Sequence, residues 1–68
     1  MREFPLTEEF IELNKLLKVQ NLVPSGGMAK MVIEDKLVRV NGEVELRKRR
    51  KLRSGDVVDF QGVSIKMV

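Results

Sequence analysis

A change in hydrophobic periodicity near the middle of the chain places the strongest constraint on its fold. Upstream of that point, apolar residues recur at helical spacing, as Ala29 and Ile33 do. Downstream, apolar and polar residues alternate, and residues 37–40 run directly into Asn41-Gly42. An Asn-Gly pair after an alternating segment is the strongest short signal for a β-hairpin. We therefore expect helices in the first half of the chain and strands in the second.

Two helices are predicted in the first half. The first is expected to start at Thr7, which can cap it, and to end near Val19. It must end before Pro24, because a proline biases the preceding residue towards an extended backbone. A second helix is expected over residues 26–35, with Ser25 as its N-cap.

Four short strands are predicted in the second half. They cover residues 37–40, 43–46, 57–60 and 63–68, with turns at Asn41-Gly42, Ser54–Asp56 and Gln61-Gly62. A chain of 68 residues suffices for one small domain. The expected fold class is α+β, in which two N-terminal helices pack on a small, mostly antiparallel sheet of about four short strands. The whole chain, residues 1–68, is expected to form that single domain.

A run of basic residues interrupts the predicted strands. Its members are Arg47, Lys48, Arg49, Arg50, Lys51 and Arg53. Six cations this close repel one another, and they cannot all find acidic partners in so small a chain. Residues 36–68 carry a net charge of +5 and residues 1–35 a net charge of −2. Predicted strands bracket the run, so it is expected to be a loop or a ragged strand edge that meets a polyanion, unless it is only a solvated positive loop.

The start of the second helix is another candidate contact. Ser25, Gly26 and Gly27 would present unpaired N–H groups to an anion, and Lys30 adds a charge one turn further on. Plain helix capping explains the same residues, and no phosphate-binding P-loop pattern is present. Lys36 and Arg39 lie near the hairpin in sequence. They either extend a basic face or are ordinary solvated charges.

Cysteine and histidine are both absent from the chain. Without them there is no disulfide, no thiolate zinc site and no imidazole to act as a general base. We therefore expect no catalytic activity, no metal and no cofactor. No apolar stretch approaches the roughly 20 residues that span a bilayer, and the first residues lack the apolar segment of a signal peptide. A cytoplasmic protein is expected.

Aromatic residues are scarce. The chain has three phenylalanines and neither tyrosine nor tryptophan. Phe10 and Phe60 belong to apolar patterns and are expected in the core. Domains that read single strands usually stack bases on exposed aromatic side chains. The scarcity therefore favours a protein that recognises the backbone and shape of folded RNA.

The spacing of several residues resembles the RNA-binding domain first described in ribosomal protein S4. That family's pattern runs roughly S-R-x-x-A-x-x-x-I-x-x-G-x-V-x-V-N-G, followed after a spacer by G-D-x-[IV]. The residues in register are Ser25, Ala29, Ile33, Val38, Val40, Asn41, Gly42, Gly55, Asp56 and Val58. The chain is similar to small bacterial stand-alone members of the YaaA/YbcJ type. It departs from the pattern at Gly26, where the family has arginine, and at Lys36, where it has glycine, so Lys36 is expected in a left-handed conformation.

The resemblance implies a cytoplasmic protein that binds structured RNA, such as ribosomal RNA or a ribosome-assembly intermediate. It implies the αL motif as the binding element. Gly26, Gly27 and Lys30 would then hold phosphates from one side and the basic run from the other. The alternative is a protein-interaction module that docks an acidic protein. A membrane-surface role ranks third, and the sequence leaves the oligomeric state open.

Overall fold

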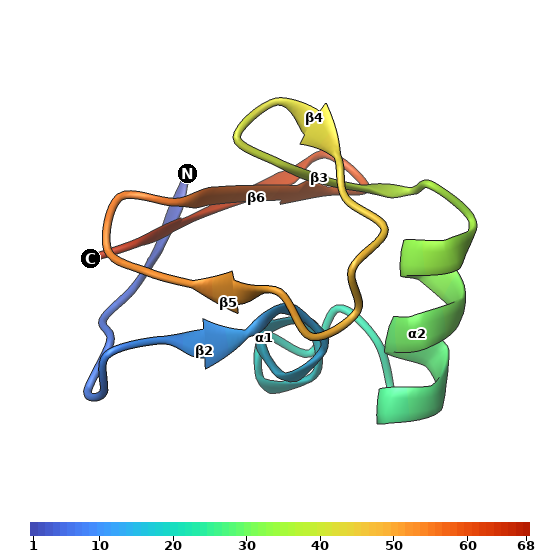
Figure 1. The fold of residues 1–68 in the computed structure, drawn as a ribbon, viewed down its shortest axis with the longest axis horizontal. Helices are drawn as coiled ribbons and strands as arrows, with labels where there is room; N and C mark the ends of the chain where they lie inside the picture. Colours follow the sequence, from blue (N-terminus) through green and yellow to red (C-terminus); the bar gives the residue numbers. More distant parts are fainter.

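The computed structural model describes all 68 residues. In chain order the elements are β1 (Arg2–Phe4), β2 (Ile11–Glu12), α1 (Leu13–Val19), α2 (Gly26–Glu34), β3 (Val38–Val40), β4 (Glu43–Val44), β5 (Lys51–Leu52), β6 (Val57–Phe60) and β7 (Val63–Met67). One layer is a five-stranded sheet with the strand order β1-β7-β6-β3-β4. It is antiparallel except where β1 pairs with β7. The other layer holds both helices and the two-stranded ribbon of β2 and β5 (Figure 1).

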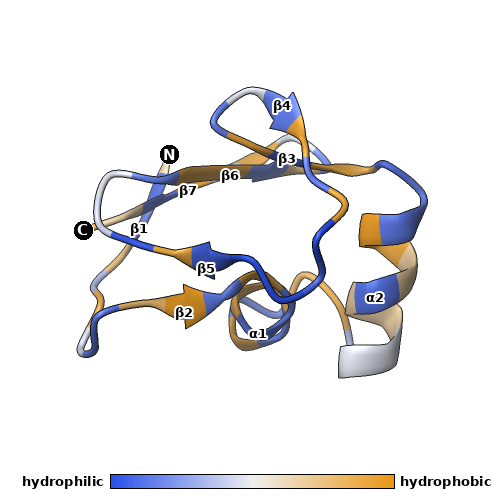
Figure 2. Ribbon diagram, viewed as in Figure 1, coloured by the Kyte–Doolittle hydropathy of each residue, from blue (hydrophilic) through white to orange (hydrophobic).

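The core lies between these two layers. Alternate residues of the sheet point into it, and the helices and the ribbon close it from the other side. Its buried apolar side chains are Leu13, Leu16, Leu17, Val23, Ala29, Val32, Ile33, Val38, Val40, Leu52, Val58, Phe60, Ile65 and Met67. Figure 2 shows hydrophobic residues along β3 and β6, whereas the segment between β4 and β5 is mostly hydrophilic. The expected core position of Phe60 is confirmed.

The second helix forms where the sequence predicts it. The Ser25 hydroxyl accepts a hydrogen bond from the backbone N–H of Met28 (3.2 Å), which confirms the N-cap. The N–H of Leu37 donates to the carbonyl of Val32 (3.1 Å) and closes the other end. Lys36, the residue before Leu37, has a φ of 63°, the left-handed conformation expected where the family pattern has glycine.

The hairpin at Asn41-Gly42 is also confirmed. Their φ values of 54° and 85° are those of the tight turn that matches the twist of paired strands. The return strand β4 is shorter than expected and ends at Val44. Gln61 and Gly62 form a similar turn between β6 and β7, with φ values of 50° and 78°.

The first helix is shorter than predicted. It begins at Leu13, well after Thr7, and no side chain caps it. The N–H groups of Leu13 and Asn14 donate instead to the carbonyls of Arg50 (2.9 Å) and Lys48 (3.0 Å). The prediction of a start at Thr7 is wrong because the residues just before Leu13 pair with β5 in an extended conformation.

The chain does not begin with two helices, since β1 and β2 precede them. The expected sheet of four strands has five, and a separate two-stranded ribbon accompanies it. Strands of three and two residues are too short to show an alternating pattern. Strands β1 and β2 form because β1 pairs with the open edge of β7 and β2 pairs with β5. Neither helix is long and apolar enough to cross a membrane.

Candidate nucleic-acid interface

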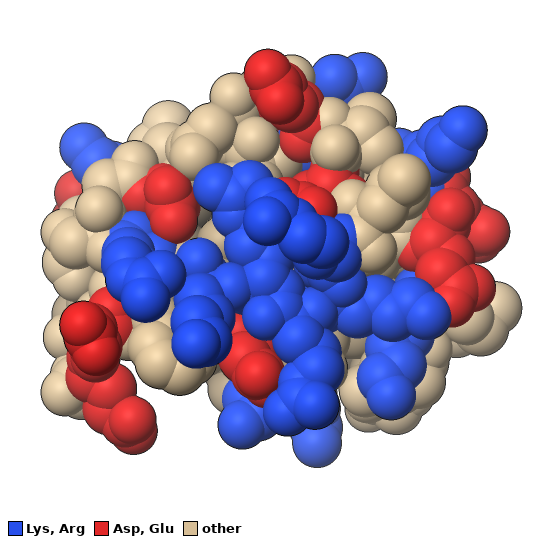
Figure 3. Space-filling model, viewed as in Figure 1, with Lys and Arg blue, Asp and Glu red and all other residues tan.

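The basic run, defined as residues 47–53, lies in the connection between β4 and β5 and in β5 itself. Its backbone is fixed to the rest of the protein, because the carbonyls of Lys48 and Arg50 accept the first N–H groups of α1. The expectation that the folded domain holds the run as a loop or a ragged strand edge is confirmed, since residues 47–50 form a connection and Lys51 lies in β5. Figure 3 shows lysine and arginine side chains gathered in the middle of the face that this connection crosses.

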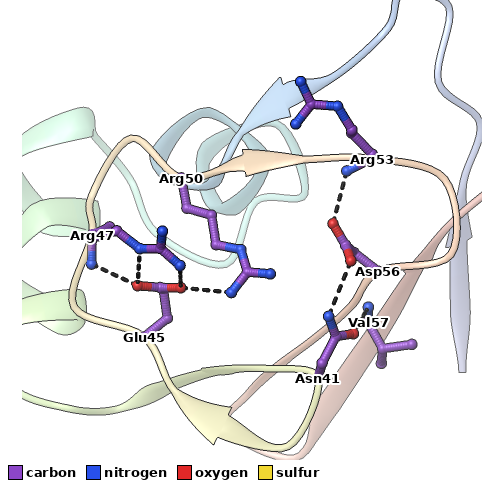
Figure 4. A network of polar contacts seen from close by, with 7 residues as sticks. All are labelled: Asn41, Glu45, Arg47, Arg50, Arg53, Asp56 and Val57. Atoms are coloured by element: carbon purple, nitrogen blue, oxygen red, sulfur yellow. Dashed lines mark hydrogen bonds and ion pairs between the residues drawn. The ribbon is translucent and has the colours of Figure 1, made fainter.

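A buried carboxylate, that of Glu45, organises the start of the run. Only 6% of Glu45 is exposed. Its two oxygens accept hydrogen bonds from the side chain of Arg47 (both 3.0 Å) and from that of Arg50 (2.7 Å) (Figure 4). The backbone N–H of Arg47 also donates to it (2.9 Å). Glu45, Arg47 and Arg50, called here the Glu45 clamp, form one connected group.

The clamp changes the acid–base properties of its members. Hydrogen bonds from the Arg47 side chain lower the pKa of Glu45 to about 2, against the opposing effect of burial, and Arg50 adds to the lowering. The same contact raises the pKa of Arg47. The Glu45 carboxylate therefore stays ionised at neutral pH and holds two arginine side chains in place. This role is not predicted by the sequence, because strand alternation gives no reason to bury Glu45.

The remaining cations of the run divide into two kinds. Lys48 forms an ion pair with Glu34 at the end of α2. Arg49 pairs with Glu12 at 3.2 Å, and 77% of its side chain stays exposed. Lys51 and Arg53 have no acidic partner and lie over the ring of Phe10, at 4.9 and 5.7 Å from its centroid. The expectation that the six cations cannot all be paired is thus confirmed.

Phe10 lies outside the core, contrary to the prediction. The pairing of Ile11 with Leu52 places Leu52 in the core, and continuing that register by one residue sets Phe10 opposite Arg53. Phe10 is half-buried under Arg53 and Lys51. The apolar pattern of residues 10–17 misleads because its first residues are extended and not helical.

Two of the residues that carry the family resemblance, Asn41 and Asp56, form a hydrogen-bond network. The Asn41 side chain donates to Asp56 (3.0 Å) and accepts from the N–H of Val57 (2.9 Å), and Asp56 accepts from the N–H of Arg53 (2.9 Å) (Figure 4). Burial alone would raise the pKa of Asp56, but the hydrogen bonds from Arg53 and Asn41 outweigh it and lower the pKa. This network ties the hairpin turn to the end of the basic run.

The start of α2 keeps the features predicted for it. Gly26 and Gly27 have helical backbone angles, and a Cβ atom at either position would meet no close neighbour. Space around the backbone therefore gives no reason for glycine at either position. Their N–H groups precede the first bonds of the helix and Lys30 is exposed.

The structure brings some of the predicted residues together and leaves others apart. Lys48 reaches Glu34, the end of α2 opposite to Ser25, and nine helical residues span roughly 13 Å. Arg39 lies on the outer face of the sheet and donates to the carbonyl of Gly42 (3.2 Å). Lys36 is exposed just after α2. The cations of the basic run therefore form one patch. The start of α2 is at the helix end opposite to the one that Lys48 reaches, and Arg39 lies on the outer face of the sheet.

Comparison with known proteins decides the family. A sequence profile of the S4 domain matches residues 4–68, nearly the whole chain. The chain belongs to the S4 domain family. The predicted resemblance to that family is confirmed.

Two bacterial relatives cover most of this S4 domain. It is 44% identical over 54 residues to the probable ribosome maturation protein RlbA of Bacillus subtilis, a match that spans 79% of this chain and 76% of the relative. It is 43% identical over 58 residues to the putative RNA-binding protein YbcJ of Escherichia coli, spanning 85% of this chain and 83% of YbcJ.

The solution structure of YbcJ from Escherichia coli has a similar fold. The TM-score is 0.74 and the identity 40%, over all of this chain and 87% of the YbcJ chain. That structure is described as revealing an αL motif involved in RNA binding. The α+β architecture with two helices and a mostly antiparallel sheet is thus common to both proteins.

Proposed function

We propose that this S4 domain binds structured RNA, such as ribosomal RNA or a ribosome-assembly intermediate, in the cytoplasm and without catalysing a reaction. The observation that carries the proposal is the basic run itself, six cations on a backbone anchored at both ends and by α1. An anchored loop needs little ordering on binding, so its charges meet a polyanion at low entropic cost. The names of RlbA and YbcJ support a role with RNA and the ribosome.

Within the proposed interface, the cations do not contribute equally. Arg49, Lys51 and Arg53 are exposed and face outward, so they offer their charge directly to phosphates. Lys48 is partly exposed beside Glu34. Arg47 and Arg50 can offer only the guanidinium N–H groups that are not bonded to Glu45. The Arg47 side chain is nevertheless 73% exposed.

The start of α2 is proposed as the second contact. Gly26, Gly27 and Lys30 would hold phosphates through N–H groups and one charge, with Ser25 fixing the helix end. Lys36 and Arg39 are proposed as flanking charges at the edges of the interface.

The test is a competition-binding assay near physiological salt. The competitors are a structured ribosomal-RNA hairpin, a DNA duplex of equal length and an unstructured RNA strand. We expect a clear preference for the hairpin, because A-form shape and 2′-hydroxyl groups distinguish it. If four to six phosphates are neutralised, log affinity falls with log salt at a slope of roughly −3 to −5. Equal binding to all three would refute structured-RNA recognition and favour an acidic protein as the partner.

Single variants of the exposed cations sharpen the test. Arg49→Ala and Lys51→Ala should each weaken hairpin binding and reduce the salt slope by roughly 1. Each should leave thermal stability almost unchanged, because the exposed ion pair of Arg49 and the exposed contact of Lys51 with the Phe10 ring each contribute at most about 1 kcal/mol. Lys66→Ala is the matched control, since it removes the same charge from the outer face of the sheet, away from the ribbon. An equal loss in the control would show that only net charge matters.

A further inference from the structure

The outer face of the β2–β5 ribbon differs from the rest of the basic surface. Leu52 points into the core, so Lys51 and Arg53 on either side of it point outward. Phe10 lies on that same outward face, beneath both cations. No acidic side chain pairs with Lys51 or Arg53. This part of the run therefore combines free positive charge with an aromatic ring.

A hollow opens beside that ring. Its volume is about 100 Å³, and it is lined by Phe4, Leu6, Thr7, Glu8, Phe10 and Ile11. Two of the three aromatic residues of the chain thus line one small depression at the surface. The size suits the edge of one planar ring and excludes a whole nucleotide. Polar groups come from Thr7 and Glu8, which are both exposed.

Arg53 is free to act as a stacking surface. Its backbone N–H binds Asp56 and fixes the position of the residue, whereas its guanidinium group forms no ion pair (Figure 4). In that figure the Arg53 side chain points away from the Glu45 clamp. Nucleobases stack both on aromatic rings and on guanidinium planes. The Arg53 guanidinium group lies over the Phe10 ring, so the outer side of that group and the edge of the ring at the hollow together form one site.

We propose that this site, called here the Phe10 hollow, binds a single unpaired nucleobase of the RNA. The inference rests on the proposed function, because the phosphates next to that base would lie on the basic run. The base stacks on the outer side of the Arg53 guanidinium group, which itself lies over the Phe10 ring, and directs its edge past that ring towards Thr7 and Glu8. A carboxylate only accepts hydrogen bonds, so Glu8 favours guanine, whose edge carries two adjacent donors, over uracil.

The probe is a pair of RNA hairpins that differ only in one unpaired guanine bulged from the stem. The natural chain is expected to bind the bulged hairpin about tenfold more tightly than the fully paired one, given the usual strength of stacking on one side chain. Equal affinity for both hairpins, with ordinary salt dependence, would overturn the base site and leave RNA binding intact. Failure to bind either hairpin would overturn the proposed function itself.

Two variants separate stacking from packing. Arg53→Lys keeps the charge but removes the plane, so the preference for the bulge should fall while the salt slope stays the same. Phe10→Leu keeps an apolar side chain and should reduce the preference while affinity for the paired hairpin persists. An equal loss of affinity for both hairpins in Arg53→Lys would overturn the proposal. The exposed position of Arg53 makes that variant informative even if Phe10→Leu proves unstable.

Discussion

The Glu45 clamp makes a prediction about stability that can be worked out from its geometry. Glu45→Gln preserves the size of the side chain but removes the charge that Arg47 and Arg50 share. The difference between a folded pKa of about 2 and the ordinary value of 4.5 corresponds to about 3 kcal/mol if fully expressed. Because 73% of the Arg47 side chain is exposed, water screens part of this energy, and we expect a loss of about 1–2 kcal/mol. For a domain of this size that lowers Tm by roughly 5–15 °C.

The pH dependence of that loss provides the sharper test. The folded pKa of Glu45 lies below its unfolded value, so the stabilisation is complete above about pH 5 and disappears as the pH falls through about 2. Thermal unfolding followed by circular dichroism at pH 7 and pH 3 measures the gap between the natural chain and Glu45→Gln. We expect the gap at pH 3 to be less than half of that at pH 7.

Glu43→Gln is the matched control for this experiment. Glu43 lies two residues earlier in the chain, is exposed and forms no ion pair. Its substitution should leave Tm within a degree or two of the natural chain at both pH values. The reasoning is refuted if Glu45→Gln has the same Tm as the Glu43→Gln control at pH 7. It is equally refuted if the gap is the same at both pH values.

Two further predictions concern the ends of α2. Ser25→Ala should reduce the free energy of unfolding by about 1 kcal/mol, and Ser25→Gly by only a few tenths, because the hydroxyl accepts the N–H of Met28. Urea unfolding of the two variants checks this order, and equal losses would contradict it. Lys36→Gly should raise the free energy of unfolding by about 0.5–1 kcal/mol. Glycine relieves the strain of the left-handed backbone, but it also raises the conformational entropy of the unfolded chain, which cancels part of that gain. A lower urea midpoint in Lys36→Gly would show that the lysine side chain contributes more than its backbone costs.

Local signals account for the parts of the fold that the sequence predicts well. The N-cap at Ser25 and the turn at Asn41-Gly42 depend on residues within a few positions of one another. The start of α1 depends instead on carbonyls of Lys48 and Arg50, which are far away in the chain. No window around Thr7 contains that information, so the local pattern predicts a helix start that is too early.

The candidate site follows the same division. The basic run is visible as a run because its members are adjacent in sequence. The burial of Glu45 and the exposure of Phe10 are not visible, because each results from contacts made across the fold. The sequence therefore predicts the position of the basic run. Only the structure shows that Glu45 holds two of its arginines and that Phe10 lies beneath two of its cations.

The bonds between the basic run and α1 also turn two amides into reporters. The N–H groups of Leu13 and Asn14 are protected from solvent exchange only while the carbonyls of Arg50 and Lys48 stay in place. Their hydrogen-exchange rates therefore measure how often the loop lifts from the protein body, with or without RNA. Both amides are bonded directly to the backbone of the loop, so a bound polyanion that holds the loop down slows their exchange. The motion of the recognition loop can thus be followed from two backbone positions inside the protein.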